Sequence, residues 1–205
     1  MDVAPPRTSH SYAYDALREK ILTGQLQPGT QLVQRNLAKE LGVSDTPVRE
    51  ALRDLATEGL VTLLPNKRTA VTILDSSEVR EIYTIRLKLE PDATRLAVAH
   101  VSLDLLLRAE ELYASMLQNA DHCSVTCGRD FHKLLLSPAP ASRLVGILNS
   151  LLDVAALFVP VARRAVPDPQ PEHGRILDAY LRKDPEAAAR AVEIHINSSL
   201  DSLQF

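Results

Sequence analysis

Three histidines in the second half of the chain have the residue type and the surroundings of metal ligands. Each follows the apolar stripe of its own predicted helix, as His132 does beside Phe131 and Leu135. The other two are His173 and His195. One inward-facing histidine is usually a hydrogen-bonded core residue, since an unpaired polar group is costly to bury. Three on facing helices favour neutral imidazoles that bind zinc, nickel or manganese.

A metal-dependent hydrolase is the alternative function that these histidines raise. Such an enzyme needs a general base beside the metal-bound water. The sequence contains no HExxH motif and no comparable arrangement of carboxylates. We therefore expect that the chain is not an enzyme.

Arg86 is the candidate partner for a small carboxylate ligand. It lies on the first predicted helix of the same half of the chain, and a guanidinium group can bind a carboxylate through two parallel hydrogen bonds. The alternative is an ion pair with Glu90, one helical turn further along. The sequence leaves both interpretations open.

A second set of candidate residues surrounds a tight turn in the first third of the chain. Gly42 allows a turn that sets two short helices at a steep angle. The second of these helices exposes small polar groups that can reach phosphates and base edges, and arginines that can bind guanine. Its candidate DNA-binding residues are Ser44, Asp45, Thr46, Arg49 and Arg53.

Two short β-prone runs follow this helix, at residues 60–64 and 70–73. Lys67 and Arg68 lie at the tip of the predicted hairpin, where a wing would meet the DNA backbone or the minor groove. An ordinary helical hairpin with solvated charges is the alternative. The agreement between the turn, the apolar pattern and the hairpin favours DNA binding.

The elements that position these residues divide the chain into two parts. After a flexible tail over residues 1–10, the order helix, helix, turn, helix, hairpin predicts a winged helix-turn-helix domain over 11–74. A linker at 75–78 leads to a domain at 79–205 with helical periodicity throughout. We expect helices near 76–100, 102–119, 121–136, 141–159, 170–182 and 185–203. The predicted fold is mainly α, with the winged helix followed by an all-α antiparallel bundle.

Composition and charge exclude several other classes. The 205 residues are 45% hydrophobic and 24% charged, which is ordinary for a globular protein. No apolar run reaches the roughly 20 residues of a membrane span, and residues 1–10 lack the apolar core of a signal peptide. We therefore expect a cytoplasmic protein with no membrane partner. The net charge of −3 permits DNA binding only if the cations cluster on one face.

Residues 12–73 resemble the GntR family of transcription regulators. The strongest motif is Thr46-Pro-Val-Arg-Glu-Ala-Leu, supported by the run from Ile21 to Thr30 and by Glu58-Gly-Leu-Val. The resemblance implies a homodimer whose two winged helices read a short palindromic operator in double-stranded DNA. It also implies DNA contacts at three positions, which are Arg35, Thr46 and Arg49.

Two residues depart from the pattern of this family. Asp45 stands where the family usually has arginine, and Arg68 stands where the wing tip usually has glycine. A carboxylate at the first position would repel a phosphate, or it could accept a hydrogen bond from N4 of cytosine. Both departures predict an atypical operator.

Residues 80–205 are similar to the FCD branch of the same family. The resemblance rests on Arg86-Leu-Lys-Leu-Glu90-Pro, Phe131-His132, Glu172-His173 and His195. It implies a ligand-responsive regulator, most often a repressor. The effector it implies is a small organic acid, such as a hydroxy acid, a dicarboxylate or a sugar acid.

The ligand set of this branch adds an aspartate four residues before the first histidine, where this chain has Gly128. Three arrangements remain open. Three histidines hold the metal and water or the effector completes the shell, or Cys127 or Asp130 substitutes for the missing ligand, or the metal has been lost. The last arrangement corresponds to a regulator whose second domain is degenerate, metal-free or independent of a ligand.

Overall fold

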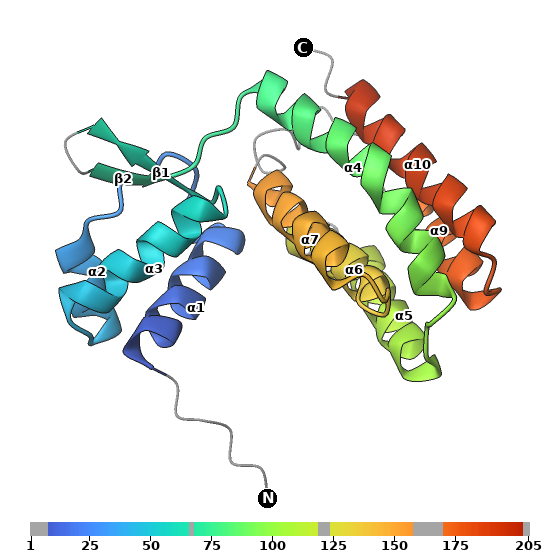
Figure 1. The fold of residues 1–205 in the computed structure, drawn as a ribbon, viewed down its shortest axis with the longest axis horizontal. Coiled ribbons are helices and arrows are strands. Elements are labelled where there is room, and N and C mark those ends of the chain that lie inside the picture. Colours follow the sequence, from blue (N-terminus) through green and yellow to red (C-terminus); the bar gives the residue numbers. More distant parts are fainter. Residues whose placement is uncertain (1–7, 66–67, 119–123, 158–169, 203–205) are drawn as a thin grey trace, which may run out of the picture. The chain divides into compact units, whose positions relative to one another are not determined.

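The computed structural model describes residues 8–65, 68–118, 124–157 and 170–202 (Figure 1). The chain forms two compact units, which divide between Ile73 and Leu74. The first unit contains the predicted winged helix, and every named element in the described part of the second unit is a helix. This mainly α architecture confirms the predicted fold class.

The first unit follows the predicted order of helix, helix, turn, helix and hairpin. Its elements are α1 Ser9–Leu22, α2 Gln34–Leu41, α3 Asp45–Thr57, β1 Val61–Leu64 and β2 Arg68–Val71. Gly42 ends α2 in a left-handed conformation with φ of 68°, which glycine adopts at little cost. Ser44 then takes an extended conformation as the N-cap of α3. The turn therefore forms where the sequence placed it.

The apolar face of α3 forms the centre of the first unit. Val48 and Leu55 are fully buried, and Leu52 is almost fully buried. Leu17 of α1 is also fully buried in this unit. Burial of this face on one side leaves the start of α3 exposed on the other, with Asp45, among its first residues, in contact with solvent.

The hairpin is antiparallel. Its second strand starts at Arg68, earlier than the predicted start at residue 70. Val61 pairs with Val71, and Leu64 pairs with Arg68. The predicted second run covers residues 70–73, whereas the observed strand ends at Val71. Pairing with β1 extends the strand back to Arg68, which thus lies on β2 itself. Lys67 lies outside the described residues.

The second unit is built from long helices. These are α4 Ser76–Val98, α5 Leu103–Gln118, α6 Ser124–Leu136, α7 Ser142–Ala156, α9 Gln170–Leu181 and α10 Pro185–Ser202. Helix α4 begins directly after Asp75, whose side chain accepts hydrogen bonds from the backbone N–H groups of Ser77 and Glu78. The predicted linker at 75–78 is therefore mostly helical, because this capping box starts the helix at Ser76.

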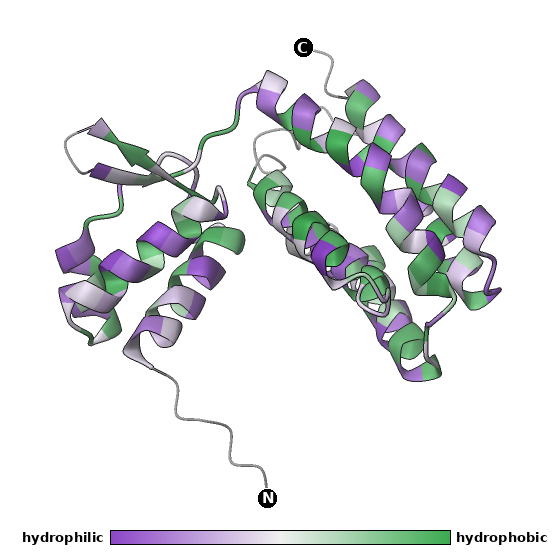
Figure 2. Ribbon diagram, in the orientation of Figure 1, coloured by the Kyte–Doolittle hydropathy of each residue, from purple (hydrophilic) through white to green (hydrophobic). Residues whose placement is uncertain are grey.

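The core of the second unit lies between α4, α10, α9, α5 and α6. Phe131 and Ile196 are fully buried there, and Tyr180 donates a hydrogen bond from its hydroxyl to the carbonyl of Leu135 at 3.1 Å. Figure 2 shows hydrophobic and hydrophilic residues alternating along each helix, as one-sided burial requires. No helix of the described ranges combines the length and apolar character that a membrane crossing needs.

Candidate functional site

The three predicted histidines come together inside the second unit. They project from α6, α9 and α10, and each is at most 6% exposed. One ring nitrogen of each lies within 4.8 Å of the others. The Nε2 atoms of His132 and His195 are 3.2 Å apart. Three separate helices therefore place three imidazoles around one point.

Two glutamates fix the orientation of two of these rings. Nδ1 of His132 lies 2.9 Å from Oε1 of Glu90 on α4. Nδ1 of His195 lies 3.0 Å from Oε2 of Glu172 on α9. An ionised carboxylate only accepts hydrogen bonds, so these contacts favour a proton on each Nδ1 and a lone pair on each Nε2.

The electrostatics of the site keep His132 neutral and Glu90 charged. Burial lowers the pKa of His132 to about 4, although the charge of Glu90 opposes this shift. Burial would raise the pKa of Glu90, but the positive charge of Arg86 and the contacts with His132 outweigh it and hold that pKa below its usual range. A neutral imidazole is the form that binds a metal.

These donors fit a divalent cation. The Nε2 atoms of His132 and His195, 3.2 Å apart, form a hydrogen bond if one of them carries a proton, and they can share one cation if neither does. Two nitrogens bound to one tetrahedral zinc at about 2.0–2.1 Å are separated by about 3.3 Å. The spacing and the tautomers favoured by Glu90 and Glu172 thus suit metal binding through Nε2 of His132 and His195.

The position of the missing aspartate faces this cluster. Gly128 is buried on α6, one turn before His132, and a Cβ atom placed on it would lie 3.7 Å from Nε2 of His173. Neither predicted substitute takes its place. Cys127 is disulfide-bonded, and a disulfide offers no thiolate to a metal.

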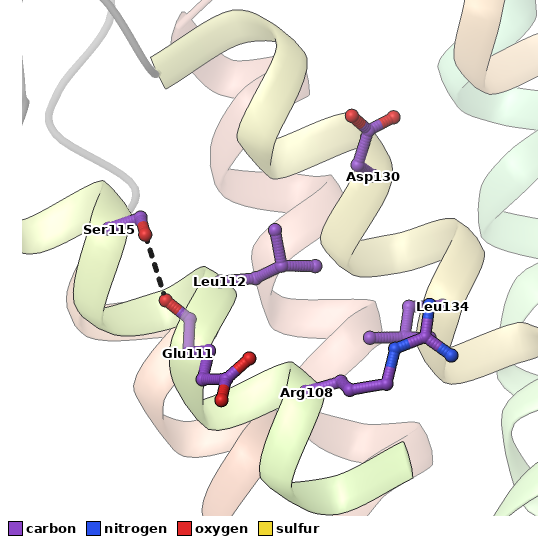
Figure 3. A pocket seen from close by; sticks show the side chains of 6 residues that line it. All are labelled: Arg108, Glu111, Leu112, Ser115, Asp130 and Leu134. Carbon is purple, nitrogen blue, oxygen red and sulfur yellow. Dashed lines mark hydrogen bonds between the residues drawn. The ribbon is translucent and has the colours of Figure 1, made fainter.

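Asp130 faces a surface pocket and not the buried histidines. Its carboxylate pairs with Arg129 at 2.7 Å. Figure 3 shows it lining a pocket between α6 and α5, together with Arg108, Glu111 and Leu134. The two-residue offset from His132 points Asp130 away from the histidines, as expected for a helix.

Arg86 is buried and forms the ion pair with Glu90 that was one of its two predicted roles. Its Nε donates to Oε2 of Glu90 at 2.9 Å, and the guanidinium lies 5.0 Å from the centre of the Tyr83 ring. The Nη2 atom has no hydrogen-bond partner among the described residues. The ion pair with Glu90 therefore forms, and Nη2 is a buried donor without a partner among the described residues.

Sequence reasoning missed the roles of both glutamates. The sequence alone suggests Glu90 as a partner of Arg86 and as part of the FCD motif, and Glu172 as part of that motif only. The available signal for Glu172 was its place next to His173 on a helix that packs against α10. Metal-binding histidines commonly donate their second ring N–H to a carboxylate, so a search for nearby carboxylates would have found both.

We expect Glu172→Gln to weaken metal binding by about 10- to 100-fold, as is typical when a carboxylate behind a histidine ligand is removed. The fold should persist, because the Glu172 side chain is 19% exposed and glutamine can still accept a hydrogen bond. Competition between the protein and a chelator measures the affinity. Glu186→Gln, in an exposed pair with Arg95, is the matched control. Equal affinities in the two variants would contradict the assigned role.

Five of the eight predicted DNA-binding residues line one groove of the first unit. Its lining includes Asp45, Arg49 and Arg53 of α3, Arg35 of α2 and Arg68 of β2. The groove has a volume of about 850 Å³. Ser44 and Thr46 are exposed at the start of α3 without lining it.

Positive side chains outnumber negative ones along this groove. Four arginines and one aspartate line it, although the whole chain carries a net charge of −3. None of the four arginines forms an ion pair with another described residue. By contrast, Lys20 in the same unit is paired with Glu40. The cations thus cluster on one face, which is the condition for DNA binding by a chain of this charge.

Comparison with known proteins identifies both units. Residues 10–71 match the family of bacterial regulatory proteins named gntR, and residues 81–198 match the FCD domain. The chain belongs to the GntR family. Its second unit places it in the FCD branch of this family, as the sequence motifs predicted.

Individual GntR relatives agree with this assignment. The gluconate operon transcriptional repressor of Bacillus licheniformis is 34% identical over 80% of this chain and 69% of its own length. The uncharacterized regulator YdhC of Bacillus subtilis is 29% identical over 93% of this chain and 89% of its own. Because these relatives are transcription regulators, this GntR protein is a regulator and not an enzyme.

The fold of a solved GntR structure extends over both units. Escherichia coli McbR/YncC superposes with a TM-score of 0.84 at 23% sequence identity, covering 97% of this chain and 98% of the other. At this identity the similarity establishes the fold alone. The ligands of the second unit and the operator of the first must be inferred from the residues of this chain.

Proposed function

We propose that this GntR regulator binds a palindromic operator as a homodimer and that a small carboxylate, bound in its second unit, changes its affinity for DNA. The observation that carries the proposal is the groove of the first unit, where four arginines have no carboxylate partner among the described residues. Binding to DNA in the cytoplasm, with repression of transcription as the outcome, is the function that fits these residues best.

Each DNA-binding residue has a distinct role in this proposal. Helix α3 enters the major groove, where Arg49 and Arg53, one turn apart, reach guanine or the adjacent phosphates. Ser44 and Thr46, at the exposed start of the helix, hydrogen bond to the backbone. Arg35 supports the phosphate contacts from α2. The wing residues Lys67 and Arg68 contact the flanking backbone or the minor groove.

The effector site is proposed at the three histidines and Arg86. A divalent metal held by His132, His173 and His195 would supply a Lewis acid for carboxylate oxygens, and zinc, nickel and manganese all suit these donors. The buried Nη2 of Arg86 would donate to the same ligand. A hydroxy acid, a dicarboxylate or a sugar acid fits this pairing, and one relative is named for a gluconate operon.

Regulation follows from the connection between the two units. Helix α4 carries Arg86 and Glu90 and begins directly after the winged helix, at Ser76. Effector binding at α4 would bias the placement of the two winged helices in the dimer. The dimer then no longer matches the spacing of the operator half-sites, and the DNA affinity falls.

Two experiments test this proposal. A gel-shift assay with the DNA upstream of the chain's own gene tests operator binding, which we expect at nanomolar protein. A thermal-shift screen of organic acids, with and without zinc, nickel and manganese, tests the sensor. Absence of a shift with every acid and every metal would contradict the sensing part while leaving the DNA-binding part intact.

Asp45 provides a test of base recognition. The carboxylate is exposed at the start of α3 and shares the groove with Arg49, so we predict that it accepts a hydrogen bond from N4 of a cytosine. Asp45→Ala should then lose about 10- to 100-fold of discrimination at one base pair of each half-site. Binding measurements on a set of single-base operator variants provide the readout.

The control for this prediction is Asp54→Ala. Asp54 is also exposed on α3, but it pairs with His10 at 2.8 Å and does not line the groove. We expect its base preferences to match those of the parent protein. If Asp45→Ala raises affinity for all sequences equally, the carboxylate acts by repelling phosphate and the base-recognition role is wrong.

A further inference from the structure

We propose that Gly128 leaves one coordination position of the histidine site to an external carboxylate, so that metal and small acid bind cooperatively and each binds weakly alone. This inference rests on the metal site proposed above and specifies how that site is regulated. Gly128 has no side chain and therefore supplies no metal ligand.

The first observation is the position of Gly128. It lies one turn before His132 on α6, buried, with its missing side chain directed at His173. A Cβ atom there would be 3.7 Å from Nε2 of His173, at ordinary contact distance. A carboxylate attached at this point would lie beside the His173 ring. Glycine leaves that position without a donor from the described residues.

The second observation is that the neighbouring donors are committed elsewhere. Within the described ranges, the grouped donor atoms at this point belong to the three histidines alone. Asp130 pairs with Arg129 and faces the pocket beside α5. Cys127 is disulfide-bonded. Glu90 and Glu172 each lie against the Nδ1 atom of a histidine, on the opposite side of the ring from Nε2.

The third observation concerns charge. Three neutral imidazoles would leave both positive charges of a divalent metal to be balanced inside the fold, and a buried charge is unfavourable unless an opposite charge pairs with it. Glu90 is already balanced by Arg86 at 2.9 Å. The carboxylate of Glu172, which is partly exposed, would offset only part of the metal's charge. An incoming carboxylate supplies the negative charge that an aspartate at position 128 would have supplied.

The fourth observation concerns the buried guanidinium of Arg86. Arg86 and His132 lie on either side of the same carboxylate, because Glu90 contacts Nε of Arg86 and Nδ1 of His132 at 2.9 Å each. The buried Nη2 of Arg86 has no hydrogen-bond partner among the described residues. Arg86 is therefore a buried cation with a spare donor on the Glu90 side of His132, where a second oxygen group of a hydroxy acid or a dicarboxylate would bind in this proposal.

Cooperativity between two ligands is reciprocal. If the acid raises the affinity for metal, the metal raises the affinity for the acid by the same factor, and couplings of about 5- to 150-fold are typical. The site would then respond to the simultaneous presence of both ligands. A site with a complete protein ligand set would retain its metal without any acid.

Calorimetric titration of the full chain with Ni²⁺, alone and in the presence of lactate, malate or gluconate, tests the inference. Titrations of each acid with Ni²⁺ in the absence of protein correct for complexes in solution. For the parent protein we expect at least one acid to raise the Ni²⁺ affinity by about 5- to 150-fold. For Gly128→Asp we expect tighter Ni²⁺ binding without acid and little further gain when acid is added.

Gly128→Ala is the matched control, because its methyl group meets His173 at ordinary contact distance and adds no donor. It should keep the dependence on acid seen in the parent protein. Tight Ni²⁺ binding by the parent that no acid strengthens would overturn the inference while leaving the metal site intact. Failure of both the parent and Gly128→Asp to bind Ni²⁺ under every condition would overturn the metal site and the inference together.

Discussion

Replacing Arg49 with alanine is expected to reduce operator affinity by at least 10- to 100-fold, because a guanidinium that binds guanine or phosphate is lost from the centre of α3. Arg49 is exposed, lines the groove and forms no ion pair with another described residue. The substitution should therefore change the free energy of unfolding by no more than about 0.5 kcal/mol. Gel-shift titration gives the affinity, and thermal unfolding checks the fold.

Lys20→Ala is the control for this experiment. It removes one positive charge from the same unit, but from a side chain that pairs with Glu40 outside the groove. We expect its operator affinity to remain within about threefold of the parent, and the oligomeric state of both variants to match the parent protein. An Arg49→Ala variant that binds the operator as tightly as the parent would show that α3 is not the reading helix.

Replacing His195 with alanine is expected to weaken metal binding by more than about 100-fold. Loss of a carboxylate behind a histidine ligand alone costs 10- to 100-fold, and removal of the ligand itself should cost more. His195 is suited to this test because its partner Glu172 is partly exposed. Water can therefore solvate that carboxylate when the imidazole is gone, and the fold should be retained.

His100→Ala is the matched histidine control. His100 is exposed, and its Nδ1 atom lies 2.9 Å from the carbonyl of Leu96, away from the three clustered histidines. Metal content after dialysis against Ni²⁺ should be preserved in this variant and lost in His195→Ala. Equal metal content in the two variants would exclude His195 as a ligand.

The helices of the second unit could be predicted from the sequence because their signals are local. The predicted range 141–159 corresponds to α7 at Ser142–Ala156, and 185–203 corresponds to α10 at Pro185–Ser202. Apolar periodicity and proline determine both. The second strand was misplaced, because its start at Arg68 depends on pairing with Leu64 across the hairpin, and pairing is not encoded in local propensity.

The site shows the same division between local and tertiary information. The apolar stripes on three predicted helices were enough to predict that His132, His173 and His195 would lie close together. The spacing along α6 was enough to direct Asp130 away from them. The contacts of Glu90 and Glu172 with the ring nitrogens were not predictable, since they depend on how α4 packs beside α6 and how α9 packs beside α10.

The central claim is that ligands of the histidine site control the affinity of the winged helix for DNA. The direct measurement is the operator affinity of the parent protein and of His195→Ala, each with Ni²⁺ and each acid and after treatment with a chelator. We predict that Ni²⁺ with one acid lowers the affinity of the parent by about 5- to 150-fold and leaves the variant unchanged. A parent affinity that no combination alters, or the same change in both proteins, would contradict the account.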